Sequence, residues 1–173
     1  HPILYFSADV AAKAEWLYGD SSDKSCLKAL FTDGTFAMLC YRLMQESQAL
    51  RLVPLAMLFN KLNAIFGQCI IGRGAEFGQR FVLIHSQGVV INSAVRGGDD
   101  VRLEHQVTIG AERGTSPCLG NRVFVGAGAK ILGNVQVGDD CRIGANAVVV
   151  EDIASGVTAV GVPAKPVGAR VPS

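Results

Sequence analysis

The sequence predicts a mainly β protein in which a short helical region precedes a solenoid of six-residue repeats, the hexapeptide β-helix. The first observation is the distribution of glycine: only Gly19 and Gly34 lie before residue 67, and the remaining 18 of the 20 glycines follow. The second is that large apolar residues recur at every sixth position from residue 71, which fits neither the helical period of about 3.6 nor the strand period of about 2. A fixed short repeat over many turns is typical of a solenoid.

We expect helices in residues 1–66, which are rich in Leu, Ala, Met, Lys and Glu. Ser22 or Asp23 is a candidate N-cap of one helix, and Thr35 precedes an apolar-periodic run that predicts a second. Pro54 falls near the first turn of a third predicted helix, where proline is tolerated. This helical N-terminal region would cover the first coil of the solenoid.

Residues 49–66 are the most apolar segment of the chain. They include charged and amide side chains and fall short of the roughly 20 apolar residues that cross a bilayer, so we predict no transmembrane helix there. The start of the chain shows no signal of basic and then apolar residues. Its first residue is His1 rather than Met, which leaves open a natural start further upstream.

The solenoid is predicted to span residues 67–155, with residues 156–173 as an extended C-terminal tail. Each six-residue unit would form a short strand and a turn, and three units would form one triangular coil of about 18 residues. Residues 71–154 would then supply between four and five coils. Thirteen of the fourteen positions in the series are large and apolar: Ile71, Phe77, Leu83, Val89, Val95, Val101, Val107, Leu119, Val125, Ile131, Val137, Ile143 and Val149.

Arg113 is the one polar position in this series, and it lies in a polar stretch near residues 110–119. We interpret the stretch as a loop that leaves the coil, with a length that keeps the register of the repeats unchanged. Loops of this kind map to the binding face of a solenoid.

Charge and cysteine content narrow the class of protein. The net charge of +1 comes from 16 basic and 15 acidic residues, so no charge surplus predicts binding to nucleic acid or anionic lipid. The five cysteines are an odd number without a C-x-x-C pair, which argues against a disulfide framework and a thiolate metal site. We therefore expect reduced thiols, a cytoplasmic protein and no bound metal.

Three segments of the predicted solenoid carry a resemblance to a known family. They are VFVGAGAKILGNVQVGDDCRIGANAVVVEDI (residues 123–153), AVGVPAKPVG (159–168) and IHSQGVVI (84–91). They resemble serine O-acetyltransferases and the related exopolysaccharide O-acetyltransferases, which are left-handed parallel β-helix acyltransferases. The last segment is similar to the family's D-H-A-T-G-I-V-V segment, whose histidine is the catalytic base.

Two further segments, VVINSAVRGGDDVRLEHQVTIG (residues 89–110) and CYRL (residues 40–43), are more similar to the acetyltransferases of colanic-acid-type exopolysaccharide assembly. The resemblance implies an acetyl-CoA-dependent O-acetyltransferase that acts on a saccharide hydroxyl in exopolysaccharide biosynthesis by direct transfer. A serine O-acetyltransferase of cysteine biosynthesis is the first alternative, and a non-catalytic β-helical scaffold is the second. A β-helical carbonic anhydrase would need three histidines on zinc, but only His85 and His105 lie in the repeats.

His85 is the general base that the resemblance implies. Histidine suits this task because its neutral form can take a proton from a hydroxyl group near pH 7. A structural imidazole that bonds a backbone carbonyl is the alternative. His105 is a second candidate, for which a catalytic role and a structural or acceptor-shaping role are both open.

The resemblance also implies the contacts of the acetyl donor. Ala127 and Ala145 match alanines that contact the CoA arm, and their separation of 18 residues would stack them on one face in successive coils. Arg142 and Lys165 would pair with the CoA phosphates. The alternatives are corner packing for the two alanines and a solvated surface charge for Arg142 and Lys165.

The chain departs from the family pattern at the partner of the base. The family's acidic residue, 15 positions before the catalytic histidine, aligns here with Ile70. The carboxylate that orients His85 is therefore unidentified, and the candidates nearby in sequence are Glu76, Asp99, Asp100 and Glu104.

A second departure lies in the predicted loop. Serine enzymes carry an Arg-His-Pro segment that helps to hold the amino-acid acceptor, whereas the matching positions here are Thr115, Ser116 and Pro117. This replacement removes the expected partner of the acceptor's carboxylate.

The resemblance implies that three chains associate in parallel, with active sites between neighbours. We therefore expect a homotrimer, with a hexamer open if the helical regions pair. The apolar stripe of residues 50–66 could rest on a membrane surface, although such stripes more often pack in a protein core or in a trimer interface.

Overall fold

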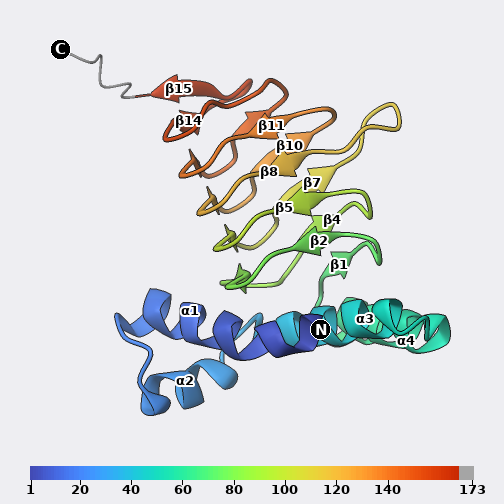
Figure 1. Ribbon diagram of the computed structural model, residues 1–173. Coiled ribbons are helices and arrows are strands. Elements are labelled where there is room, and N and C mark those ends of the chain that lie inside the picture. Colours follow the sequence, from blue (N-terminus) through green and yellow to red (C-terminus); the bar gives the residue numbers. More distant parts are fainter. Residues whose placement is uncertain (168–173) are drawn as a thin grey trace.

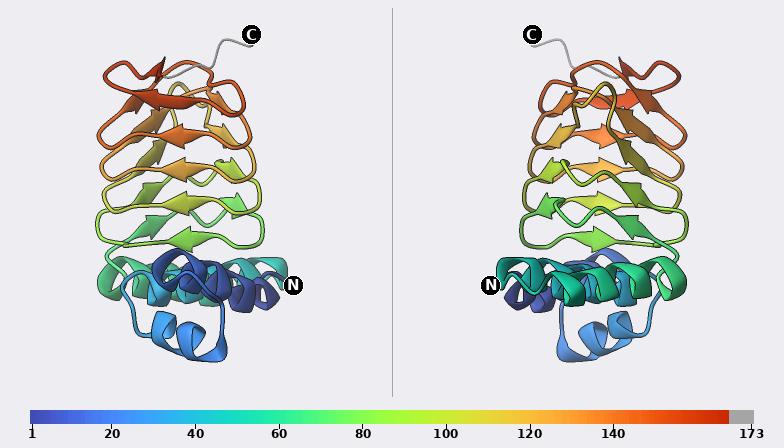
Figure 2. Two further views of the ribbon diagram at one scale, coloured as in Figure 1. Left: turned by 90° about the vertical axis from the view of Figure 1, so that its left-hand side faces the viewer. Right: turned by 90° about the vertical axis from the view of Figure 1, so that its right-hand side faces the viewer.

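The computed structural model describes residues 1–167 of the chain. A layer of helices covers one end of a parallel β-helix, whose coils stack above it (Figure 1). The side views show that α2 (Asp23–Leu30) lies on the side of this layer that faces away from the coils (Figure 2). The other helical elements are the 3-10 helix η1 (Pro2–Tyr5), α1 (Phe6–Tyr18), α3 (Thr35–Ala49) and α4 (Val53–Phe66).

The helix starts follow local chemistry. Ser22 is the N-cap of α2, and its hydroxyl accepts a hydrogen bond from the backbone N–H of Ser25. The N-cap of α3 is Gly34, with a φ of 82°, rather than Thr35. The Thr35 hydroxyl instead donates to the carbonyl of Ala29, at 2.7 Å, and so ties α3 to the end of α2. Pro54 lies in the first turn of α4, as predicted.

The structure also describes the state of the cysteines and the character of the helices. The five cysteines are free thiols in the structure. Within residues 1–167, no helix combines the length and the apolar character needed to cross a membrane.

The strands of the solenoid are short and form three faces. The first face is the sheet β1-β4-β7-β10-β13, the second is β2-β5-β8-β11, and the third is β3-β6-β9-β12-β14-β15. Neighbours are parallel, except that β15 runs antiparallel to β14. The strands are β1 (Ile70–Ile71), β2 (Glu76–Phe77), β3 (Val82–Leu83), β4 (Val90–Ile91), β5 (Arg96–Gly97), β6 (Arg102–Leu103), β7 (Thr108–Gly110), β8 (Cys118–Leu119), β9 (Phe124–Val125), β10 (Lys130–Leu132), β11 (Gln136–Val137), β12 (Arg142–Ile143), β13 (Val148–Val149), β14 (Thr158–Val160) and β15 (Lys165–Val167).

The strand register differs from an unbroken six-residue series. Ile71 pairs with Ile91, twenty residues on, and Ile109 pairs with Ile131, twenty-two residues on, whereas Ile91 and Ile109 are eighteen apart. Two extra residues are therefore inserted at the corner after β3, and four more in the loop of residues 111–117 after β7. The predicted loop does not preserve the register by itself. Together the two insertions add six residues, the length of one repeat. The six-residue series of apolar positions therefore continues in the sequence on both sides of the insertions.

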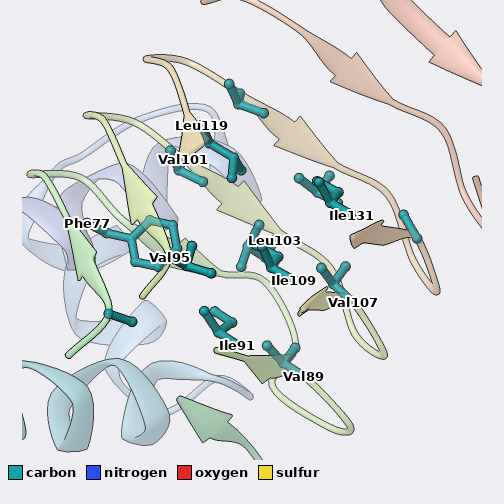
Figure 3. Packing of buried hydrophobic residues seen from close by; sticks show 14 of the residues in the cluster. Phe77, Val89, Ile91, Val95, Val101, Leu103, Val107, Ile109, Leu119 and Ile131 are labelled. Carbon is teal, nitrogen blue, oxygen red and sulfur yellow. The ribbon is translucent and has the colours of Figure 1, made fainter. Parts of the chain in front are cut away.

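A consequence of the insertions is that four residues of the predicted series occupy a different place in the coil. Val89, Val95, Val101 and Val107 are buried, but they stand two residues before the strand positions Ile91, Gly97, Leu103 and Ile109. The four valines and Ile91, Leu103 and Ile109 belong to the core of the solenoid, where Figure 3 shows Val95, Leu103 and Ile109 among the packed side chains.

The helical layer also bonds the open strand edge of the first coil, because no coil lies below it to pair its backbone groups. The donors and acceptors are side chains of α1, α3 and α4. The bonds join Tyr41 Oη to Ala75 O (3.1 Å) and Phe77 N (3.0 Å), Arg42 to Phe77 O (3.0 Å) and Gly78 O (2.6 Å), Asn60 Nδ2 to Ile71 O (2.8 Å), and Asp9 Oδ1 to Phe81 N (2.9 Å).

The corner between the second and third faces explains why glycine follows the core residue in many repeats. The backbone N–H of each turn donates to a polar side chain of the next coil: Gln79 to Asp99, Asp99 to Asn121, Asn121 to Asp139, and Asp139 to Ser155. A Cβ at Gly78 would lie 2.0 Å from Asp99 Oδ1. Any larger residue would displace the side chain that bonds the turn.

The end of the solenoid is more ordered than the predicted tail. Within residues 156–173, β14 pairs in parallel with β12 and thereby continues the third face, and β15 folds back against it. Residues 168–173 lie outside the described residues.

Candidate active site

The candidate histidines and alanines form one column along the corner between the third and first faces. Each stands two residues after a core residue of the third face, and these core residues pair in register from coil to coil. The column runs from His85 after Leu83, through His105 after Leu103 and Ala127 after Val125, to Ala145 after Ile143. Four residues spread over 60 positions therefore stack beside one another, which requires both the insertion of two residues at the His85 corner and the insertion of four residues after β7.

Two histidine–carboxylate pairs lie at the base of this column. The rings of His85 and His105 are 5.9 Å apart between centroids, with an interplanar angle of 72°. His85 Nδ1 lies 3.4 Å from Asp33 Oδ2, and His105 Nδ1 lies 3.6 Å from Glu104 Oε2. Both histidine side chains are 46% exposed, so each ring is open to a substrate. With a proton on Nδ1 facing its carboxylate, Nε2 is the nitrogen that can accept a proton.

Asp33 is the carboxylate that sequence reasoning missed. It belongs to the turn before α3, more than fifty residues ahead of His85, and no spacing in the sequence links the two. The carboxylates that lie nearby in sequence have other partners. Glu104 faces His105, Glu76 pairs with Arg96, Asp100 pairs with Arg80 and Arg102, and Asp99 accepts from the backbone N–H of Gln79.

A buried lysine fixes the turn that carries Asp33. Lys13 of α1 is 0% exposed, and its ammonium donates to the backbone carbonyls of Asp33 and, at 2.8 Å, of Leu83. Burial lowers the pKa of Lys13 to about 8, an effect that the nearby charge of Asp33 opposes. Gly34 packs so closely that a Cβ there would lie 2.4 Å from Leu83 O. The helical layer is thus held against the strand that leads to His85.

A small cavity of about 200 Å³ adjoins the His85 corner, between the helical layer and the turn after β3. Its lining combines three exposed or half-exposed aromatic rings with amides and one carboxylate, and it includes no Lys or Arg. The lining residues are Phe31, Thr32, Asp33, Gly34, Phe36, Phe66, Gly67, Gln68, Ser86 and Gln87.

The candidate CoA residues lie further along the solenoid. Ala127 is half-buried and Ala145 is exposed in the column, so both leave room along the corner. Arg142 lies on the third face with its guanidinium 4.6 Å from the centre of the Phe124 ring. Lys165 of β15 pairs in register with Val160, and its ammonium lies 2.7 Å from Glu151 Oε2. The two alanines therefore lie in the same column as the histidines. Arg142 and Lys165 lie outside it, in contact with Phe124 and Glu151.

The loop residues Thr115 and Ser116 make local bonds. The Thr115 hydroxyl donates to the carbonyl of Glu112, at 2.7 Å, and the Ser116 hydroxyl donates to Asn92 Oδ1, at 3.0 Å. Among residues 1–167, no group of three His, Cys, Asp or Glu side chains is arranged to hold a metal ion.

The chain is similar to known proteins at the level of family, sequence and structure. A family model described as bacterial transferase hexapeptide (six repeats) matches residues 119–150. The serine acetyltransferase of Helicobacter pylori (strain J99 / ATCC 700824) is 44% identical over 140 residues, which cover 79% of this chain and 82% of the relative.

Two solved structures superpose on most of this chain. A serine acetyltransferase in complex with CoA superposes with a TM-score of 0.86 at 29% identity, covering 96% of this chain and 69% of that chain. The Neisseria gonorrhoeae serine acetyltransferase in complex with serine superposes with a TM-score of 0.80 at 31% identity, covering 92% of this chain and 67% of that chain.

Proposed function

The chain belongs to the serine acetyltransferase family of hexapeptide-repeat enzymes, and from this premise we propose that it transfers the acetyl group of acetyl-CoA to the hydroxyl group of L-serine. It is an acyltransferase, an O-acetyltransferase that uses acetyl-CoA as co-substrate. The observation that carries the choice of acceptor is the 44% identity to a serine acetyltransferase across most of both chains.

This assignment corrects the saccharide acceptor and the role in exopolysaccharide biosynthesis that the sequence analysis favoured. The similar proteins are serine acetyltransferases. A physical reason for the error is that the deciding residues of one segment, residues 40–43, do not face an acceptor. In CYRL, Tyr41 and Arg42 are buried and bond the open edge of the first coil. Such residues stabilise the contact between the helical layer and the first coil, and enzymes with different acceptors can share them.

We propose that His85 is the general base. Its Nε2 takes the proton of the serine hydroxyl while the oxygen attacks the thioester carbonyl. A C–O ester bond then forms as the C–S bond breaks, and the proton passes from the imidazolium to the departing thiolate of CoA. The base is regenerated and no acyl-enzyme is formed. The reaction depends on holding the base, the hydroxyl and the thioester together, which the cavity and the column beside His85 support.

The test of this function is CoA release in the presence of L-serine. We expect a thiol reagent to report CoA release that depends on L-serine, with O-acetylserine identified by mass spectrometry. D-Serine and L-threonine serve as matched controls, because they keep the charges of the acceptor and change its shape. Release of CoA at the same slow rate with and without L-serine would overturn the proposed acceptor.

We further propose that the pantetheine arm of CoA lies along the column at Ala127 and Ala145. The change Ala145→Phe should then raise KM for acetyl-CoA at least about tenfold, because an aromatic ring would fill the space beside the corner. Ala94→Phe is the control, since Ala94 is exposed at a different corner. Steady-state kinetics against acetyl-CoA measure both variants, and equal KM values would contradict the proposed path of the arm.

We propose a homotrimer as the assembly, with a hexamer open if the helical layers pair. The support from this chain is that Ile70 and Val90 pair in register on the first face and are both exposed, at 54% and 40%. Sedimentation equilibrium measures the mass directly, and a monomer at all concentrations would refute the assembly.

A further inference from the structure

We propose that Asp33 is the positioning residue of His85, so that the helical layer supplies part of the active site. This inference rests on the proposed function, in which His85 is the base. The family position for the orienting carboxylate holds Ile70 here, and Ile70 faces outward on the first face with no charge to offer. Another element must hold the imidazole.

The geometry favours Asp33 over every carboxylate nearby in sequence. Asp33 Oδ2 lies 3.4 Å from His85 Nδ1, within ion-pair distance. His105 is a further titratable neighbour of the ring, and it has Glu104 as its own partner. When His85 takes the serine proton, the carboxylate of Asp33 stabilises the positive charge that forms on the ring.

Lys13 sets the separation between Asp33 and His85. Its buried ammonium bonds the carbonyl of Asp33 on one side and the carbonyl of Leu83, two residues before His85, on the other. The two peptide groups are therefore fixed to one point, although they are fifty residues apart.

The absence of a Cβ at Gly34 completes the arrangement. Its φ of 82° is in the left-handed region, and its Cα packs against the carbonyl of Leu83. This close approach brings the turn of Asp33 to the corner of His85. A side chain at residue 34 would push the carboxylate away from the imidazole.

The test combines kinetics with a direct view of the His85 ring. We expect Asp33→Asn to lower kcat about 10- to 100-fold with little change in KM for acetyl-CoA. The loss should be smaller than the roughly 10⁴-fold effect of removing a buried triad carboxylate, because the Asp33 side chain is 64% exposed. Glu76→Gln is the matched control, since Glu76 pairs with Arg96 on the second face.

The second readout is the tautomer of each imidazole, from two-bond ¹H–¹⁵N correlation spectra in mildly alkaline buffer. We expect His85 to carry its proton on Nδ1 in the wild type and to shift toward the Nε2–H form in Asp33→Asn. Glu104→Gln should change the tautomer of His105 and leave that of His85 unaltered. This readout needs no substrate, so it separates a failure of Asp33 from a failure of the proposed acceptor.

The kcat and the tautomer of the Asp33→Asn variant together decide the proposal. A fall in kcat together with a tautomer shift supports the proposal. An unchanged tautomer overturns it, whatever happens to kcat, because Asp33 would then act on the acceptor or not at all. A shifted tautomer with wild-type kcat would show a contact that does not serve the reaction, which also overturns it.

Discussion

We expect replacement of His85 by Gln to lower kcat by about a thousandfold while the protein stays folded. General-base catalysis contributes about 10²- to 10⁴-fold, and Gln keeps the approximate size and polarity of the ring without its basicity. His85 is 46% exposed at a corner, so the packing of the solenoid does not depend on it. Steady-state kinetics measure the loss, and a thermal melt within a few degrees of the wild type shows that the fold is intact.

The control for this variant is His105→Gln, the matched change 5.9 Å away. If His85 is the base, the His105 variant retains much more activity than the His85 variant. The reverse order would transfer the role of base to His105 and its partner Glu104. Activity of the His85 variant within tenfold of the wild type would exclude it as the base.

We expect replacement of Arg42 by Met to destabilise the protein by about 3–5 kcal/mol, the cost of leaving a buried charge without its partner. Arg42 and Asp9 are both 0% exposed and form a two-bond pair, with Nε to Oδ2 at 2.7 Å and Nη2 to Oδ1 at 3.0 Å. The variant also leaves the carbonyls of Phe77 and Gly78 unbonded at the open end of the solenoid. Urea denaturation measures the free energy of unfolding.

The matched control is Arg122→Met, which removes an exposed pair with Asp140 at another corner. This variant should lose little free energy of unfolding, because solvent screens an exposed ion pair. Equal losses for the two variants would contradict the role of Arg42 as the bridge between the helical layer and the first coil. Since the same layer carries Asp33, the Arg42 variant should also lose activity before it unfolds globally.

The register of the coils shows how far a repeat can be predicted. The apolar positions from Ile71 to Val149 are buried, and the sequence therefore revealed the solenoid. It did not reveal that Val89 and Val107 stand outside the strand positions. An insertion of two residues followed by one of four restores a period of six, and apart from Gly97 both sets are buried and apolar. Only the pairing of strands distinguishes the two sets.

The candidate active site, too, could be predicted only in part from the sequence. The stacking of Ala127 and Ala145 could be predicted, because they lie one regular coil apart. The stacking of His85 and His105 beneath them could not, because both insertions fall within that part of the chain. The acceptor was predicted wrongly from residues 89–110 and 40–43, and in the second segment Tyr41 and Arg42 bond the first coil rather than an acceptor.

The sequence by itself determined the hexapeptide solenoid, the helical region before it and the candidate base, because these signals arise within single repeats or from a local motif. Only the tertiary structure decided which carboxylate faces His85 and how the first coil is closed. Both depend on contacts between segments far apart in the chain, Asp33 with His85 and Asp9 with Arg42 and Phe81. Such contacts are set by how a helical layer docks on the end of a solenoid, and no periodicity in the chain encodes that docking.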